Sequence, residues 1–363
     1  MHPTTFSRAL LAVCFFLLVF IPQSFAGKLE FGEVWAFLMN GEERFFDPSR
    51  PITDIGYFGA GVNSLGKLAG IPDRGRIKQY GGRVHLVVAV VDNYAITHFC
   101  LDPQYALRDQ LALDIVRGAQ LFDGVQIDFE SVLPQDYENF YSFLSLLKAG
   151  LGEKILGVAL PAAVNEKQDC FGYARVAAIA DRVVIMAYDE HWSGSEPGPV
   201  ASLGWCRKVS SYALSKIPVQ KLVMGAPFYG RAWADKNLSR AYKYAGMASL
   251  VDEKQIGKVE RREGIPFVEY VETVGVKVYF EDAASACLRL SMYRKASVDK
   301  VAFWRLGQED PAIWENIAIT VLAPESVWVE RRKAEKAGIE DEFGLPSLLR
   351  HANRSDRPVL VPR

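Results

Sequence analysis

The sequence of 363 residues predicts an α/β protein, a TIM (β/α)8 barrel with a small α+β insertion after the seventh strand. Eight short apolar or β-branched runs end in polar residues, and the longer stretches between them, such as 136–151, have helical periodicity. Near-continuous apolar strands that alternate with amphipathic helices are typical of a parallel sheet covered on its outside. We expect the strands at 33–39, 54–60, 83–92, 124–130, 155–161, 182–189, 222–229 and 300–306.

The insertion is indicated by the interval between the last two strands. Their first residues, Leu222 and Lys300, are about twice as far apart as a βα unit requires. We therefore expect an inserted segment at about 235–298. The part at 257–280 is rich in Val, Tyr and Phe, which favours strands, and a helix is expected at 283–294.

Composition indicates a globular protein outside the nucleic-acid-binding class. Half of the residues are apolar and 23% are charged, a balance that disfavours disorder. Lys and Arg number 42 against 43 Asp and Glu, so the formal charge of -1 supplies no field that would attract nucleic acid. We expect neither a nucleic-acid partner nor an obligate protein partner.

The chain divides into a leader at 1–26, the barrel at 27–325 and a polar tail at 326–363. We expect the tail to form an exposed helix followed by a mobile end. Four cysteines follow the leader, and their spacing assigns no disulfide pairing, so buried free thiols are the alternative. They are Cys100, Cys170, Cys206 and Cys287.

The leader has the pattern of a secretory signal peptide. Arg8 precedes an apolar run at 9–21, and the small-residue exit at 24–26 follows. The run is shorter than the ~18 to 20 residues of a spanning helix. We expect cleavage after Ala26 and a protein that is secreted or located in the periplasm or cell envelope. An uncleaved anchor is an alternative, and Cys14 leaves a lipoprotein as another.

The fourth expected strand carries a row of polar side chains. It follows Asp123, and the two-residue period of a strand places Gln126, Asp128 and Glu130 on one face. The residues between them are apolar and suit packing against helices, so the polar face points into the barrel. Barrel enzymes carry their reactive groups at the carboxyl ends of the strands. Two acids inside a barrel are costly to bury unless they have a partner or a role in the reaction.

This strand resembles the D-x-x-D-x-D-x-E signature of family 18 glycoside hydrolases, the chitinase family, with Gln126 in the place of the second acid. Three further strand ends are similar to motifs of the same family. They are Met186-Ala187-Tyr188-Asp189, which looks like M-x-Y-D, Tyr229-Gly230-Arg231, which looks like Y-x-R, and Trp304 on the eighth strand. The resemblance covers most of the chain after the leader, and it implies a barrel whose insertion forms one wall of the substrate cleft.

The chain departs from typical chitinases at two strands. The third ends Val90-Val91-Asp92-Asn93 where chitinases show S-x-G-G, and the fourth has Phe129 where they often have Trp. The runs at 187–192 and 197–201 are similar to the spore-germination and spore-cortex branch of the family, which acts on peptidoglycan-derived glycan. The resemblance therefore implies a glycan rich in N-acetylglucosamine, of peptidoglycan or chitin type, as substrate and partner.

The resemblance also implies a retaining, substrate-assisted hydrolysis, in which the acetamido oxygen of the substrate attacks the anomeric carbon. Glu130 would be the general acid and base, Asp128 would orient the acetamido group and stabilise the oxazolinium ion, and Tyr188 would donate its hydroxyl to the acetamido oxygen. No cofactor and no metal ion are implied, and no histidine cluster stands at the strand ends.

Further positions are assigned by the resemblance to binding of the sugars. Trp304 would form an apolar floor, and the other positions would be Asp123, Gln126, Met186, Asp189, Tyr229 and Arg231. The amide of Gln126 is expected to donate a hydrogen bond to Asp128 and so keep Asp128 ionised over a wide pH range. His191 and Trp192 follow the M-x-Y-D motif and are expected to line a loop, without an assigned role. A glycan-binding protein that has lost catalysis is the competing function.

Overall fold

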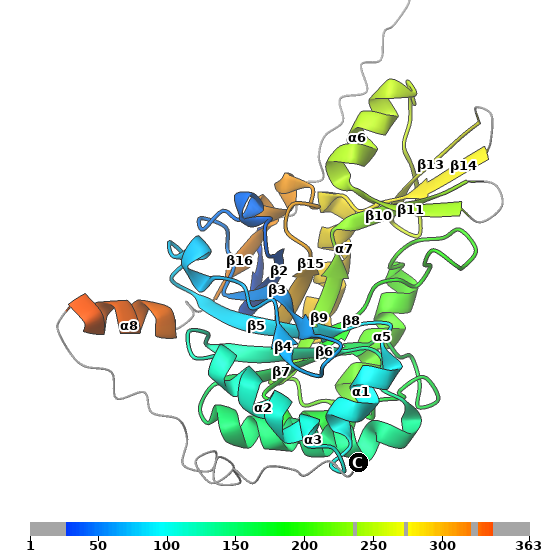
Figure 1. Cartoon of the computed structure of the whole chain (residues 1–363). Coiled ribbons are helices and arrows are strands. Elements are labelled where there is room, and N and C mark those ends of the chain that lie inside the picture. Colours follow the sequence, from blue (N-terminus) through cyan, green and yellow to red (C-terminus); the bar gives the residue numbers. More distant parts are fainter. Residues whose placement is uncertain (1–26, 235–237, 272–274, 321–325, 337–363) are drawn as a thin grey trace, which may run out of the picture.

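The computed structural model describes residues 27–234, 238–271, 275–320 and 326–336, and within them eight parallel strands form a closed barrel (Figure 1). Pairing between the first and second of these strands closes the ring. The predicted fold class is thereby confirmed. In chain order the strands are β2 (Glu33–Met39), β3 (Asp54–Val62), β5 (Arg83–Val90), β6 (Gly124–Phe129), β7 (Ile155–Pro161), β8 (Arg182–Met186), β9 (Leu222–Pro227) and β15 (Lys300–Trp304).

Five of these strands, β5, β6, β8, β9 and β15, end one to three residues before the expected position. The polar residues that close the corresponding sequence runs therefore lie on loops above the barrel. Short strands outside the ring complete the sheets: β4 (Leu68–Ala69) pairs antiparallel with β3, and β1 (Leu29–Phe31) pairs parallel with β16 (Ile317–Ile319).

Six helices cover the barrel after five of the strands, because two of them follow β5. They are α1 (Tyr94–Leu101), α2 (Leu107–Gly118), α3 (Tyr137–Leu151), α4 (Tyr173–Ile179), α5 (Leu203–Lys216) and α7 (Ala283–Lys295), and the 3-10 turn η4 (Pro311–Asn316) follows β15. After β2 and β3 the described chain has only the 3-10 turns η1 (Glu43–Phe45) and η2 (Arg74–Ile77), and η3 (Pro134–Asp136) precedes α3. The segments after β2 and β3 are interrupted by proline and glycine, which explains why no longer helix forms there.

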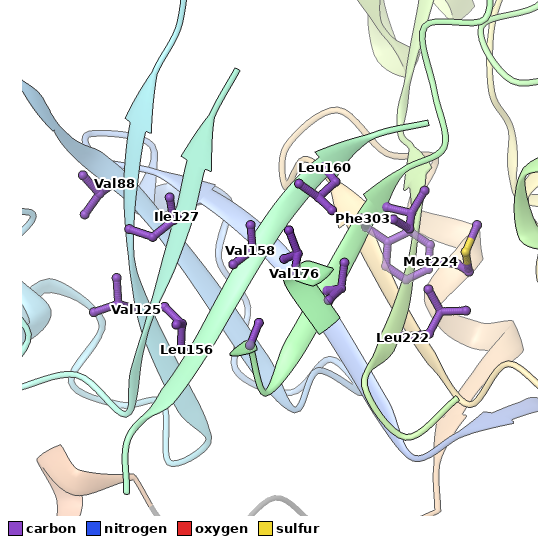
Figure 2. Close-up of a cluster of buried hydrophobic side chains, with 14 of the residues drawn as sticks. Val88, Val125, Ile127, Leu156, Val158, Leu160, Val176, Leu222, Met224 and Phe303 are labelled. Atoms are coloured by element: carbon purple, nitrogen blue, oxygen red, sulfur yellow. The ribbon is translucent and has the colours of Figure 1, made fainter. Parts of the chain in front are cut away.

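The hydrophobic core has two layers, one on each side of the barrel wall. Figure 2 shows part of the outer layer, to which side chains of β6, β7 and β9 and Val176 of α4 belong. The inner layer consists of residues that point into the barrel: Trp35, Phe37, Phe58, Val87, Val184, Val223 and Ala302. The two layers reflect the alternation of side chains along each strand.

A buried ionic network fills the amino-terminal end of the barrel. Arg83 Nε donates to Asp54 Oδ1 over 2.7 Å, and His85 Nε2 lies 2.8 Å from the same oxygen. Arg182 donates to Glu33 Oε1 over 2.6 Å. Burial acts to raise the pKa of Asp54, but hydrogen bonds from His85 and Arg83 outweigh it and lower that pKa. The buried acids Glu33 and Asp54 therefore have cationic or histidine partners.

The insertion forms a small α+β unit between β9 and α7. Its five-stranded antiparallel sheet has the order β11-β10-β14-β13-β12, with bounds β10 (Tyr229–Ala234), β11 (Leu238–Lys243), β12 (Glu260–Arg262), β13 (Ile265–Val271) and β14 (Gly275–Tyr279). Helix α6 (Tyr244–Glu253) packs on it through Met247, beside Val268 and Val278. Strands β10 and β11 precede the part expected to form strands. The turn at Glu263 and Gly264, where both φ angles are positive, joins β12 to β13.

A buried ion pair fixes the insertion to the barrel. Arg289 of α7 donates to Glu281 over 2.7 Å and to the carbonyl oxygen of Ala201 over 2.8 Å, and its side chain is fully buried. Glu281 follows β14, whereas Ala201 precedes α5. The pair therefore joins the end of the insertion to the loop that follows β8.

The remaining segments partly fall within the described residues. Helix α8 (Val327–Lys336) forms in the tail, and the guanidinium of buried Arg74 lies 5.6 Å from the ring of Trp328. The leader at 1–26 and the expected mobile end after residue 336 lie outside the described residues. All four cysteines are free, with Cys170 exposed and the others buried. No helix in the described ranges has the length and apolar character needed to cross a bilayer.

Candidate active site

A cavity of about 150 Å³ opens at the carboxyl ends of the barrel strands. It brings together seven of the residues expected in the site: Gln126, Asp128, Glu130, Met186, Tyr188, Asp189 and Trp304. Phe37, Phe58, Ala159 and Val184 complete the lining. The sequence does not single out these four, because apolar residues near strand ends look the same whether they face a core or a cavity.

Strand β6 delivers the acids to this cavity through its side-chain alternation. Val125, Ile127 and Phe129 pack in the outer hydrophobic layer, so Gln126 and Asp128 point inward. Asp128 is 6% exposed. Glu130 lies one residue beyond the strand and is exposed, and its backbone N–H donates to the carbonyl oxygen of Val90 over 3.0 Å. The side chains of Gln126, Asp128 and Glu130 thus run from a buried amide to a solvent-accessible carboxyl group at the mouth of the cavity.

The surroundings of Asp128 favour its protonated form. Burial, and next the charge of Glu130, raise the pKa of Asp128 to about 7. Its Oδ1 atom is buried without a hydrogen-bond partner, and so are both amide atoms of Gln126. The expected hydrogen bond from Gln126 to Asp128 is therefore not formed, and the expectation that Asp128 stays ionised over a wide pH range is wrong. The unpartnered oxygen is available to a ligand.

The pKa of Glu130 is also raised, by partial desolvation of its carboxyl group in the cavity and then by the charges of Asp92 and Asp189. Asp92 follows β5 and has a positive φ of 56°, an uncommon conformation for a residue other than glycine. The next residue, Asn93, caps α1 by accepting a hydrogen bond from the N–H of Ile96, and its own N–H donates to Ser131. These contacts hold the backbone of Asp92 beside Glu130. The sequence shows Asp92 only as a departure from the chitinase pattern.

Tyr188 is placed so that its hydroxyl stays protonated. Burial, and next the charge of Asp128, raise the pKa of Tyr188 well above its usual range. Gly225 of β9 makes room for this ring, because a Cβ atom there would lie 3.1 Å from it. The hydroxyl can therefore act as a hydrogen-bond donor in the cavity at any pH near neutrality.

Asp189 links the cavity to the insertion. Tyr229 Oη donates to Asp189 Oδ1 over 2.5 Å, and Arg231 donates to the same oxygen over 3.1 Å. Tyr229 and Arg231 stand on β10, so two expected sugar-binding residues contact Asp189 in this structure. Arg231 keeps its Nε atom buried and without a partner.

Trp304 closes the cavity from the end of β15. Its ring packs edge-on to Phe58, with centroids 4.8 Å apart, and lies 5.7 Å from Phe37. An aromatic wall of this kind offers an apolar face to a sugar ring, whose C–H groups have no better partner in water.

Asp123 lies away from this group. It precedes β6 at the amino-terminal end of the strand, where its carboxylate accepts a hydrogen bond from the backbone N–H of Val84 over 2.8 Å. Four residues of strand separate Asp123 from Asp128, so the two carboxylates lie at different levels of the barrel. The placement of Asp123 supports a structural role in joining β5 to β6 rather than the sugar contact that the resemblance implies.

The described part of the chain offers no ligand set for a metal ion. No group of three or more His, Cys, Asp or Glu side chains is arranged there to hold a metal ion. Among the acids of the cavity, Asp189 is paired with donors of the protein, Tyr229 and Arg231.

The fold and this arrangement of acids define a class of protein that comparison with known families identifies. The model of glycosyl hydrolases family 18 matches residues 110–309, more than half of the chain. The chain belongs to this family, and the predicted family is confirmed.

Two curated relatives show how much of this chain is similar to known proteins. An uncharacterized glycosylase, YvbX, of Bacillus subtilis (strain 168) is 30% identical over 207 residues, which cover 53% of this chain and 60% of the relative. A cortical fragment-lytic enzyme of Bacillus anthracis is 28% identical over 234 residues, which cover 59% of this chain and 54% of the relative. The chain spans about half the length of the curated relatives it matches.

Solved structures show the same fold. The spore cortex-lytic enzyme SleL of Bacillus cereus superimposes with a TM-score of 0.73 at 24% identity, covering 82% of this chain and 77% of that one. A chitinase of Chromobacterium violaceum ATCC 12472 gives a TM-score of 0.70 at 22% identity, covering 78% and 97% of the two chains. At these identities the likeness shows the fold alone.

The position of Asp92 leads to a prediction about pH dependence. With Glu130 in the expected role of general acid, which works while protonated, activity should fall as pH rises through the pKa of Glu130. Because the Asp92 charge raises that pKa, Asp92→Asn should move the alkaline limb of kcat/KM to lower pH, with the acidic plateau within about twofold of wild type. Asn tolerates positive φ, so the backbone is retained.

The matched control for this prediction is Asp109→Asn on α2, which removes an exposed carboxylate paired with Arg108. Its pH profile should match that of wild type. An alkaline limb that stays in place in Asp92→Asn would show that Asp92 does not tune Glu130.

Proposed function

We propose that this protein is an exported glycoside hydrolase that cleaves β-linked glycans containing N-acetylglucosamine, with retention of configuration and by substrate assistance. The observation that carries the proposal is the cavity in which Asp128, Glu130 and Tyr188 meet above an aromatic floor. Glu130 and Tyr188 have the protonation behaviour that their roles require, since the pKa of each is raised. Family membership supports glycan hydrolysis as the reaction class.

In the first step, Glu130 protonates the glycosidic oxygen while the acetamido carbonyl oxygen of the substrate attacks the anomeric carbon. The bond to the leaving sugar breaks, and an oxazolinium ion forms. Unpartnered Asp128 Oδ1 accepts the acetamido N–H, and the Tyr188 hydroxyl donates to the acetamido oxygen. In the second step, Glu130 removes a proton from water, the water oxygen attacks the anomeric carbon, and the acetamido group is released.

We propose that the protein cleaves a peptidoglycan-derived glycan in preference to chitin. The curated relatives include enzymes named for lysis of cortical fragments, and a spore cortex-lytic enzyme shares the fold. A chitinase shares the fold as well, so the two glycans form the two arms of the test. Purified peptidoglycan and chitin should be digested side by side and the products identified by mass spectrometry, with faster release of products expected from peptidoglycan.

Replacement of the general acid tests the proposed chemistry. Glu130→Gln keeps the shape of the side chain but delivers no proton, so turnover of a chromogenic N-acetylglucosamine oligomer should fall by ~10²- to 10⁴-fold while glycan binding persists. A variant that retains more than about a tenth of wild-type activity would remove Glu130 from this role. Absence of turnover by the wild-type protein, with binding retained, would favour the non-catalytic glycan-binding function.

The stereochemistry of the product tests substrate assistance. Two displacements at the anomeric carbon restore its configuration, so proton NMR of the first-formed product should show the β-anomer. A substrate whose 2-amino group lacks the acetyl group at the cleaved sugar should resist cleavage, because the attacking oxygen is missing. The α-anomer as initial product would contradict substrate assistance.

Export is tested on the protein itself. The leader pattern at 1–26 supports cleavage after Ala26, so the mature chain from the native host should begin at Gly27 and be found outside the cytoplasm. Amino-terminal sequencing of the fractionated protein provides the measurement. A chain that still begins at Met1 in the membrane fraction would favour the uncleaved anchor.

A further inference from the structure

Two cationic side chains from distant parts of the chain meet at the ring of Phe45. The guanidinium carbon of Arg44 lies 4.7 Å from the centre of this ring, and Lys243 Nζ lies 4.7 Å from it as well. Arg44 belongs to η1, which follows β2, whereas Lys243 ends β11 of the insertion. Cation–π contacts with one ring therefore hold two positive charges close together. We call Arg44 and Lys243 the rim pair.

Contacts on two sides place the rim pair beside the cavity. Gly307 lies against the ring of Phe45, where a Cβ atom would come within 2.5 Å, and it follows the cavity residue Trp304 by three positions. Lys243 is paired with Tyr229 between β10 and β11, and directly opposed residues of an antiparallel pair have their side chains on one face. The hydroxyl of Tyr229 reaches the wall of the cavity. The rim pair thus stands between the end of β15 and the insertion.

The acids next to the rim pair have other partners. Glu42 is paired with Arg305. Glu43 accepts a hydrogen bond from Tyr57 over 2.5 Å and lies 3.6 Å from Arg76. Within the described ranges no carboxylate forms an ion pair with either member of the rim pair, whose contacts are those with the ring. Its positive charge is therefore available to a ligand.

The charges around the mouth of the cavity are divided between two sides. Asp92, Glu130 and Asp189 follow β5, β6 and β8, and the charges of Asp92 and Asp189 act on Glu130. The rim pair stands on the segments that follow β2 and β9, the two neighbours of β15 in the ring. An anionic group is repelled on the first side and attracted on the second. A glycan that carries such a group is therefore favoured in one orientation.

We propose that the rim pair binds a carboxylate on a substituent of the glycan and so selects an anionic glycan over a neutral one. Guanidinium and ammonium groups both form charge-assisted hydrogen bonds with carboxylates. Peptidoglycan carries carboxylates on its muramic acid units, at the lactyl group or at the peptide attached to it, whereas chitin carries none. This inference rests on the proposed function, because it supplies a physical basis for the preference for a peptidoglycan-derived glycan over chitin.

The test compares a charged substrate with its neutral form. kcat/KM is measured for peptidoglycan strands of defined length that an amidase has freed of peptide, and for the same strands after their lactyl carboxylates are coupled to methylamine. The ratio of charged to amidated strands should exceed one in wild type. In the double variant Arg44→Gln, Lys243→Gln it should fall by about 3- to 10-fold, the effect of two partly exposed ion pairs. An unchanged ratio overturns the proposal.

Strands that keep their peptides form a further arm, which identifies the source of the carboxylate. A larger loss of kcat/KM by the double variant on these strands assigns the bound group to the peptide. A larger loss on peptide-free strands assigns it to the lactyl group. The matched control is Arg207→Gln, Lys208→Gln, which removes the same charge from exposed positions of α5 and should keep the wild-type ratio.

Ionic strength separates a charge effect from altered packing. Between ~0.1 M and ~1 M salt the Debye length shortens from about 10 Å to about 3 Å. The ratio of charged to amidated strands should therefore fall in wild type towards that of the double variant, whose own ratio should change little. A wild-type ratio that does not respond to salt overturns the proposal.

A binding measurement separates this inference from the proposed activity. Calorimetry compares the affinities of Glu130→Gln for charged and amidated strands with those of the triple variant Glu130→Gln, Arg44→Gln, Lys243→Gln. A preference for charged strands that is at least about threefold weaker in the triple variant supports the rim pair, even if wild type cleaves neither substrate. Equal preference in the two proteins, or no binding by either, overturns it. Cleavage of chitin by wild type in that case would leave the proposed hydrolysis intact.

Discussion

Burial of Asp128 inside the barrel is the constraint on which the rest of the site depends. The alternation of β6 points Gln126 and Asp128 inward, and no donor of the protein satisfies Asp128 Oδ1. A buried carboxylate without a partner favours its protonated form, which raises the pKa to about 7. The burial of neighbouring Tyr188, and next the charge of Asp128, keep the pKa of Tyr188 high. A ligand that supplies an N–H group to Asp128 would therefore replace a missing interaction rather than compete with an existing one.

The pKa values of the acids are shifted in opposite directions at the two ends of the barrel. At the amino-terminal end, Glu33 and Asp54 have arginine and histidine partners, and their pKa values are lowered despite burial. At the carboxyl end, Asp128 and Glu130 have no such partners, and their pKa values are raised. In the first arrangement each buried charge has a partner, and the second leaves acids at the mouth whose raised pKa values suit proton transfer. Asp123 belongs with the first set by position, although it stands in the same sequence motif as Asp128.

How far the sequence predicts this protein follows from what each pattern encodes. Apolar runs and their spacing are enough to predict eight strands, because each run is an independent local signal. The inward face of β6 is also predictable, since alternation needs only one strand. The hydrogen bond expected from Gln126 to Asp128 fails because two residues on one strand face need not bring their polar atoms within bonding distance. The sequence motif does not predict that Asp123 lies at the amino-terminal end of the barrel, because a sequence pattern alone does not give positions along the barrel axis.

The contacts of Asp189 depend on the insertion, and for that reason the sequence does not predict them. The carboxylate lies on the loop after β8, and both of its protein donors, Tyr229 and Arg231, stand on β10. These partners are about 40 residues away in the chain, so only the closed barrel and the docked insertion bring them together. Arg289 and Glu281 hold the far end of the insertion to the loop before α5. The loop that carries Asp189 and Trp192 is thus held from the insertion at one point and from the barrel helices at another. A loop held at both points presents its side chains to a ligand without a large entropic cost of ordering, which is what a site for an extended chain molecule requires.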